Sequence, residues 1–236
     1  MSAICGDRAI AAIDGGRYPR YGPAPVMLVK KRRSSPKRRE GNETASRIVL
    51  VAREILMDEG YAHFSMRNVA SRAGMHLNNV QYYFKTRKHL VRALVEDTGA
   101  RYRASYDKLL AGAPADPVAR FNALIEFSLR DVSTWETRRF FIQLWALLIT
   151  LDDRSGSLLD DLYAIDIEQL SGFIAELVPG AAPAEIRRRA SVLAAMIEGM
   201  VVVRGAHTRN AAEMKRLLAR AHAVGMEIAL GRIPEE

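Results

Sequence analysis

The residues best suited to chemistry lie in "LNNVQYYF" (77–84), which holds two asparagines, one glutamine and two tyrosines but no charge. On a helix, Leu77, Val80 and Phe84 recur at i, i+3 and i+7 and face inward. Asn and Gln amides match the donor and acceptor of adenine in the major groove, and Tyr hydroxyls suit phosphates. A merely solvated surface is the alternative for such a face taken alone. The side chains left outward are Asn78, Asn79, Gln81, Tyr82 and Tyr83.

The flanking segments predict the elements that position this face. "TASRIVLVAREILMDEG" (44–60) places an apolar stripe on one side of a helix and ends at Gly60, a suitable residue to follow a helix. Ser65 can cap a short second helix that stops at Gly74. Two short helices joined by a glycine-containing turn predict a helix-turn-helix.

The next predicted helix begins with cations. Thr86 can cap it, and Arg87, Lys88 and His89 would fill its first turn. Positive charge at a helix N-terminus opposes the helix dipole. A DNA phosphate bound at that helix end would remove the conflict, which favours a DNA-binding role for the whole segment.

Residues 44–95 resemble the DNA-binding head of the tetracycline-repressor (TetR) family. The family pattern has a helix ending in Gly and an aromatic, a Ser/Thr-capped helix ending in Ala-Gly, a recognition helix closing in aromatic residues and Phe, and then Ser/Thr followed by Lys. The matching residues here are Gly60-Tyr61, Ser65, "VASRAG" (69–74), "QYYF" (81–84) and "KTRKHL" (85–90).

The resemblance implies a role for each matching residue. It implies base-edge contacts from Leu77, Asn78, Asn79 and Gln81. It implies phosphate contacts from Tyr82, Tyr83 and Arg87, with Ser65, Arg67 and Lys88 nearby. Two residues depart from the pattern. His76 replaces the usual Ser/Thr cap and could donate to a phosphate instead, and Arg87 replaces the usual Lys and changes the donor geometry.

The net positive charge is confined to the first 95 residues. Residues 1–43 carry ten Lys/Arg and four Asp/Glu, residues 44–95 carry eight and three, and residues 96–236 carry 17 and 20. This asymmetry predicts a polyanion-binding head on a mildly acidic body. We expect a disordered basic arm over 1–43, a helix-turn-helix domain over 44–95 and a helical ligand-binding and dimerisation domain over 96–236. Met27 precedes the basic run, so residues 1–26 could instead reflect a misassigned start.

The body predicts further amphipathic helices near 117–132, 135–152, 157–178, 184–206 and 211–230, which gives an all-α fold of about nine helices. A nearly all-apolar helix followed by a heptad-like seam indicates a four-helix bundle formed with a second copy. TetR-like proteins dimerise in this way, as the resemblance implies, although both helices could instead close the subunit's own core. The expected interface residues are Met196, Met200, Leu217, Ala221, Val224 and Ile228.

Aromatic side chains of the body could line a ligand cavity, although such stripes are more often plain core. The candidates are Phe127, Phe141, Gln143, Trp145 and Tyr163. Glu198 interrupts the most apolar helix. We favour its pairing across the interface with Arg204 or His207 of a partner, and the alternative is an anchor for a cationic effector.

The composition and the lack of certain motifs exclude several classes of protein. A single cysteine, Cys5, excludes an internal disulfide framework, and no histidine spacing or motif indicates a metal, a cofactor or a catalytic site. The longest apolar run is too short to span a bilayer, so we expect a cytoplasmic protein without a membrane partner. The expected partners are a double-stranded DNA operator, a second copy and an unknown small-molecule effector. A sequence-blind DNA binder and an all-α enzyme remain the alternatives.

Overall fold

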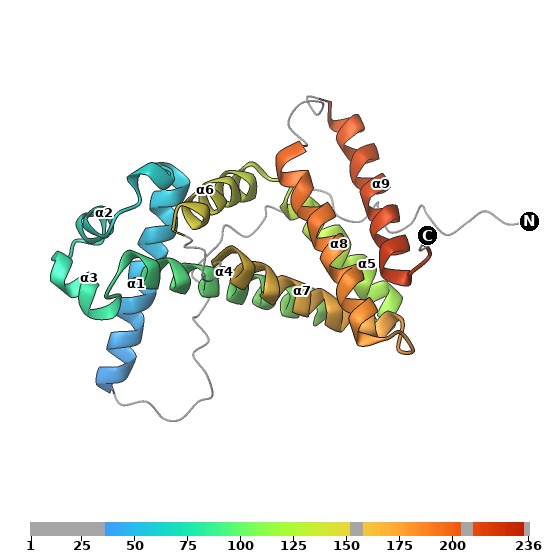
Figure 1. Cartoon of the computed structure of the whole chain (residues 1–236), viewed down its shortest axis with the longest axis horizontal. Coiled ribbons are helices and arrows are strands. Elements are labelled where there is room, and N and C mark those ends of the chain that lie inside the picture. The colour runs from blue at the N-terminus through green and yellow to red at the C-terminus, as the bar shows by residue number, and fades with distance from the viewer. Residues whose placement is uncertain (1–35, 152–157, 204–209, 234–236) are drawn as a thin grey trace, which may run out of the picture.

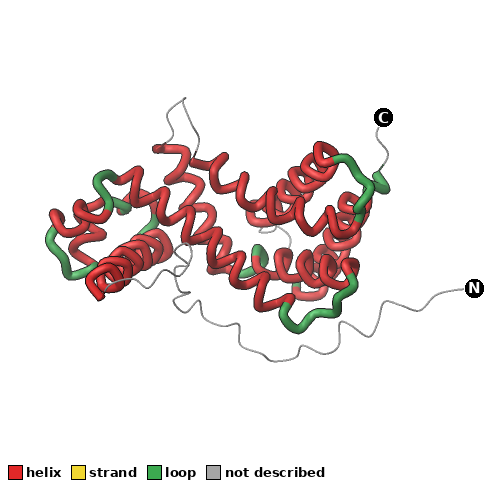
Figure 2. Tube along the Cα trace, turned by 90° about the horizontal axis from the view of Figure 1, so that it is seen from below, coloured by secondary structure: helices red, strands yellow, loops and turns green. Residues whose placement is uncertain are grey.

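The computed structural model describes residues 36–151, 158–203 and 210–233, which are mostly helical (Figures 1 and 2). These residues contain no strand, which confirms the all-α prediction. The α-helices within the described ranges are α1 (Pro36–Asp58), α2 (Met66–Arg72), α3 (Leu77–Tyr83), α4 (Arg87–Leu110), α5 (Pro117–Asp131), α6 (Trp135–Leu151), α7 (Leu158–Leu177), α8 (Pro183–Val203) and α9 (Ala211–Leu230), with a 3-10 helix η1 (Tyr61–His63) after α1.

The first helix is longer than its apolar stripe predicts. α1 begins at Pro36, so residues 36–43 are helical and the prediction of disorder was wrong for them. Proline is favoured in the first turn of a helix, where its missing N–H is not needed, and the Lys, Arg and Glu that follow are good helix formers. Residues 36–43 are polar and have no apolar periodicity, so the sequence pattern did not predict this part of the helix. The rest of the expected arm, residues 1–35, lies outside the described residues.

The head packs around one small apolar core. Ile48 and Ile55 of α1, Val69 of α2, Val80 of α3 and Leu90 of α4 are fully buried there. In Figure 1, α1, α2, α3 and the start of α4 lie together at one end of the molecule. Each short helix contributes few apolar side chains, so α2 and α3 depend on packing against α1 and α4 for their stability.

α4 continues from the head into the body. It buries Leu90 and Leu94 at the head and Tyr106 in the body, so the predicted boundary between residues 95 and 96 falls inside a continuous helix. In the body, α7 packs against α4 and α8, and α9 packs against α5 and α8. α6 contacts α1 and η1 of the head as well as α7 and α8 (Figure 1). None of the described helices combines the length and apolarity needed to cross a membrane.

Candidate nucleic-acid interface and body cavity

The turn between α2 and α3 is built by local signals. Ser65 caps α2, since its Oγ accepts from the Asn68 N–H at 3.1 Å. At the other end Gly74 has φ of 66°, and the Met75 N–H donates to the Ala70 carbonyl at 2.9 Å. A residue in the left-handed region, followed by an N–H that bonds back to a carbonyl of the last helical turn, is a Schellman motif. Glycine adopts this left-handed conformation without strain. The predicted cap and stop of this helix are confirmed.

α3 presents its amide side chains to solvent. Val80 is fully buried, and Leu77 and Phe84 are half-buried against the head core. Asn78, Asn79, Gln81 and Tyr82 are exposed, which confirms their predicted orientation. Tyr83 differs: it is half-buried, packs on the core and meets the Tyr82 ring edge-on at 5.2 Å. The outward face of α3 is therefore smaller and more amide-rich than predicted.

The cationic flank lies at the N-terminus of α4. Thr86 caps this helix by accepting from the His89 N–H at 3.2 Å. The Arg87 guanidinium lies over the Phe64 ring at 5.7 Å, and its Nε is buried without a hydrogen-bond partner among the described residues. Burial lowers the pKa of Arg87 from its usual value, but arginine remains a cation at neutral pH. An unsatisfied donor and a helix N-terminus together suit an anion.

The remaining predicted contact residues lie around this end of the head. Ser65, Arg67 and His76 are exposed, and Lys88 is half-buried. His76 makes no side-chain cap to α3, as its departure from the family pattern suggests. Contact of any of these residues with DNA stays a prediction.

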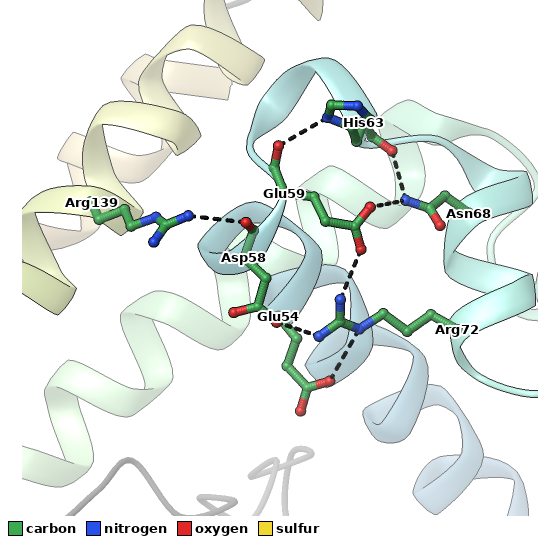
Figure 3. Close-up of polar contacts among 7 residues, drawn as sticks. All are labelled: Glu54, Asp58, Glu59, His63, Asn68, Arg72 and Arg139. Carbon is green, nitrogen blue, oxygen red and sulfur yellow. Dashed lines mark hydrogen bonds and ion pairs between the residues drawn. The ribbon is translucent and has the colours of Figure 1, made fainter.

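A polar cluster joins α2 to the end of α1 (Figure 3). Arg72 pairs with Asp58, with Glu59 at 2.8 Å and with Glu54 at 3.9 Å. Asn68 donates to the Glu59 carboxylate at 2.8 Å, and its hydrogen bond, followed by that of Arg72, lowers the pKa of Glu59. Exposed pairs of this kind contribute little individually, but a shared arginine fixes the angle between two helices. The cluster therefore orients the helix that precedes α3.

A second set of contacts joins the head to α6. The Gln143 amide oxygen accepts from the Tyr61 N–H at 2.8 Å. Arg139 donates to the Asp58 carbonyl at 2.9 Å, as Figure 3 shows. Gln143 does not line the body cavity, so its assignment to the pocket was wrong. Gln143 lies away from the inward face of α6 and contacts Gly60. A Cβ atom at Gly60 would lie within 2.9 Å of the Gln143 amide oxygen.

The body contains a cavity between α4, α5, α6, α7 and α8. Of the predicted pocket residues, Phe141 and Tyr163 line it. Phe127 and Trp145 lie behind the wall, where Phe127 packs on Tyr106 at 5.6 Å and Trp145 on Phe141 at 6.0 Å. Glu198 also lines the cavity, a position that does not fit its expected pairing with Arg204 or His207 across an interface. Arg204 and His207 themselves lie outside the described residues.

Two acidic residues of the cavity wall were not predicted from the sequence. Asp131 of α5 and Asp166 of α7 line the cavity with Glu198. Asp166 falls between Leu162 and Leu170 at four-residue spacing, so an acidic residue on an apolar stripe was the available signal. Burial raises the pKa of Asp166 to about 6, and burial with the neighbouring Asp166 and Asp131 carboxylates raises the pKa of Glu198 to about 8.

The raised pKa of Glu198 predicts how the free energy of unfolding changes with pH. The folded protein holds the Glu198 proton up to about pH 8, whereas the unfolded chain releases it near 4.5. The free energy of unfolding therefore falls as pH rises from about 5 to beyond 8, by on the order of a few kcal/mol. Glu198→Gln should flatten this fall in urea titrations at pH 6 and 9. The exposed Glu168→Gln is the control, and parallel curves for wild type and Glu198→Gln would contradict the assignment.

The outer faces of α8 and α9 expose apolar side chains. Val192, Val202 and Val203 of α8 are 56%, 59% and 70% exposed, and Leu217 and Val224 of α9 are also exposed. Exposed apolar residues gathered on two neighbouring helices indicate a surface that another molecule covers. We call these five residues the α8–α9 face.

Only part of the predicted interface lies on that face. Met196 and Met200 are half-buried, whereas Ala221 and Ile228 are buried against the subunit's own core, and contact of any of these residues with a second copy stays a prediction. At 100° per residue, Ala221 and Ile228 lie on one side of Leu217 and Val224 lies on the other. The seam thus runs along the boundary between the core and the exposed face.

Comparison with known proteins places the head in a family. Residues 48–94 match the family model described as "Bacterial regulatory proteins, tetR family". A helix-turn-helix-type transcriptional regulator, uncharacterised, in the dhlA 5′ region of Xanthobacter autotrophicus is 36% identical over 110 residues, covering 45% of this chain and 54% of that protein. The chain thus spans about half the length of that relative.

Solved structures share the fold at low identity. A Pseudomonas aeruginosa protein described as a transcriptional regulator superposes with a TM-score of 0.62 at 18% identity, covering 86% of this chain and 97% of that one. A regulator from Saccharomonospora viridis, solved in complex with choline, gives 0.56 at 19% identity over 75% and 94%. The fold is that of a helix-turn-helix protein with a helical body. The head, residues 48–94, is similar to the TetR family of bacterial regulatory proteins.

Proposed function

We propose that this chain is a sequence-specific DNA-binding regulator of transcription that acts as a homodimer on a near-palindromic operator, as a ligand-responsive repressor. The observation that carries the proposal is the α3 face, where Asn78, Asn79 and Gln81 are exposed on a helix whose other side is buried. A rigid helix with outward amides suits the major groove, and the cationic start of α4 suits the adjacent phosphates. Such a protein works where bacterial DNA lies, in the cytoplasm.

A dimer is supported by the α8–α9 face. Each subunit exposes apolar side chains there on two adjacent helices, and a second copy would complete a four-helix bundle. A two-fold axis through this bundle would present two heads, so the operator should have two half-sites one helical turn or more apart. We assign DNA binding to residues 44–95, and dimerisation and ligand binding to residues 96–236.

An effector is supported by the cavity in the body. The cavity shares α6 with the junction to the head: Phe141 lines it, and Gln143 holds the Tyr61 N–H. A ligand that shifts α6 would move the contacts that orient the head. Choline in the Saccharomonospora viridis regulator, which shares this fold, is consistent with ligand binding by such a body.

Substitutions on α3 and α4 should have different effects on DNA binding. Asn79→Ala should weaken binding by about 1–3 kcal/mol for duplexes that carry the preferred base pair at one position, and relax preference there. Arg87→Ala should weaken binding to every duplex and reduce the salt slope by about one. Fluorescence anisotropy with operator duplexes that differ at single base pairs measures both.

A sequence-blind DNA binder would respond otherwise. Its affinity would fall equally for all duplexes when Asn79 is replaced, because only the backbone would be contacted. Asn122→Ala on α5 is the control and should leave all affinities unchanged, since Asn122 lies in the body and its side chain donates to the Val118 carbonyl.

A further inference from the structure

The body cavity is acidic and has no basic residue in its wall. Asp131, Asp166 and Glu198 come from three different helices, α5, α7 and α8. All of the lining residues are described, and none of them is Lys, Arg or His. Carboxylates that gather in a partly buried space without a cation repel one another, so their charged forms are unfavourable in the empty protein.

One of the three carboxyl groups has a buried oxygen atom without a hydrogen-bond partner in the described part of the chain. Asp131 is already held, since the Tyr102 hydroxyl donates to it at 2.5 Å and the Thr137 hydroxyl at 3.2 Å. The Glu198 Oε2 atom is buried without a hydrogen-bond partner among the described residues. Asp166 lines the same cavity, where burial raises its pKa. A buried acceptor left unsatisfied is unfavourable, so a water, an ion or a ligand that supplies a donor or a positive charge there would be stabilised.

Four aromatic rings form part of the remaining wall, beside aliphatic and small polar residues. Tyr102, Tyr106, Phe141 and Tyr163 line the same space as the carboxyl groups. The Tyr102 ring lies 6.1 Å from Tyr106 and 6.0 Å from Phe141, so three rings form a continuous surface. Aromatic faces attract cations through their quadrupole, and aromatic cages recognise quaternary ammonium groups.

We propose that this cavity binds a small organic cation of the alkylammonium class, with Glu198 and Asp166 as counter-charges and the tyrosine and phenylalanine rings as walls. The free volume of about 50 Å³ holds a few water molecules, which suits a compact cationic group better than a polycyclic drug. An anionic ligand would meet three carboxyl groups and no cation. The inference rests on the proposed function, because it names the chemical class of the effector.

The cation should bind more tightly as pH rises. Burial raises the pKa of Glu198 to about 8 and that of Asp166 to about 6, so both carboxylates are available only above about pH 8. Burial also raises the pKa of Tyr106 and Tyr163, so these phenols stay neutral. The other titratable groups of the cavity wall are Asp131, which also acts on Glu198, and Tyr102. A bound cation favours ionised Glu198, so binding releases a proton.

Tetramethylammonium is a suitable probe because its charge does not change with pH. Its neutral counterpart is tert-butanol, which has the same number of heavy atoms and a similar shape, and sodium chloride controls for ionic strength. Isothermal titration of the full-length protein, without DNA, should show saturable binding of tetramethylammonium and at least about tenfold weaker binding of tert-butanol. Affinity for tetramethylammonium should rise by about tenfold between pH 6.5 and 9.

Variants assign this binding to the carboxyl groups. Glu198→Gln should weaken tetramethylammonium binding at pH 9 by at least about tenfold, and Asp166→Asn gives a second, independent loss. Glu168→Gln, which removes an exposed carboxylate from α7, should leave the affinity unchanged. Equal binding of the cation and tert-butanol, or unchanged affinity in folded Glu198→Gln and Asp166→Asn, would overturn the proposal. Because DNA is absent, such a result would leave the proposed function standing, which operator binding tests separately.

Discussion

Val192→Asp should convert the protein from a dimer to a monomer and reduce operator affinity by about 10²–10⁴-fold. Val192 is 56% exposed on α8, within the α8–α9 face. In the proposed bundle an aspartate at this position would be buried among apolar side chains of the interface, and its unpaired charge would lose its hydration in each subunit. A monomer loses the gain in effective concentration that comes from linking two heads on two half-sites.

Sedimentation velocity and anisotropy titrations measure these two effects. Val118→Asp is a matched control, since Val118 is 45% exposed on α5 and lies outside the α8–α9 face. It should remain dimeric and retain operator affinity. A dimeric Val192→Asp protein, or a monomeric one with wild-type affinity, would contradict the assigned interface.

Phe64→Ala should abolish operator binding while the body stays folded. Phe64 is 2% exposed in the head core, where it precedes the capped start of α2 and lies beneath Arg87. Removing a buried phenylalanine destabilises by about 3–5 kcal/mol. Because α2 and α3 are only seven residues each, they have little stability of their own to offset that loss.

Thermal unfolding and operator titrations below the unfolding transition test this expectation together. Phe121→Ala is the control, because Phe121 is fully buried on α5 of the body. It should lower the melting temperature comparably and still bind operator at low temperature. If Phe64→Ala retained wild-type affinity there, the rigid head would not be what presents α3 to DNA.

The head could be predicted closely because its determinants are local. Ser65 and Thr86 cap the helices that follow them, and Gly74 ends α2 with a positive φ, all within a few residues of where they act. The apolar spacing around Val80 then determines which side of α3 faces solvent. The start of α1 was missed for the opposite reason, since a polar first turn carries no apolar periodicity to mark it.

The body was less predictable because its determinants act across long distances in sequence. Gln143 is held by a backbone N–H 82 residues away, and no local pattern signals such a contact. The cavity combines Asp131, Asp166 and Glu198 from separate helices, so its acidity emerges only from packing. Likewise, only the packing of α9 on α5 and α8 shows that Ala221 and Ile228 lie within the subunit's core.

The most direct test of the account is the ratio of affinities for selected and random DNA. Duplexes are selected by the full-length protein from a random pool, and the best sequence is compared with a random duplex of equal length at 150 mM salt. We expect the selected sequence to contain an inverted repeat and to bind at least about 10³-fold more tightly, as specific regulators do. A ratio near one, with no repeated motif among the selected duplexes, would contradict sequence-specific recognition by α3.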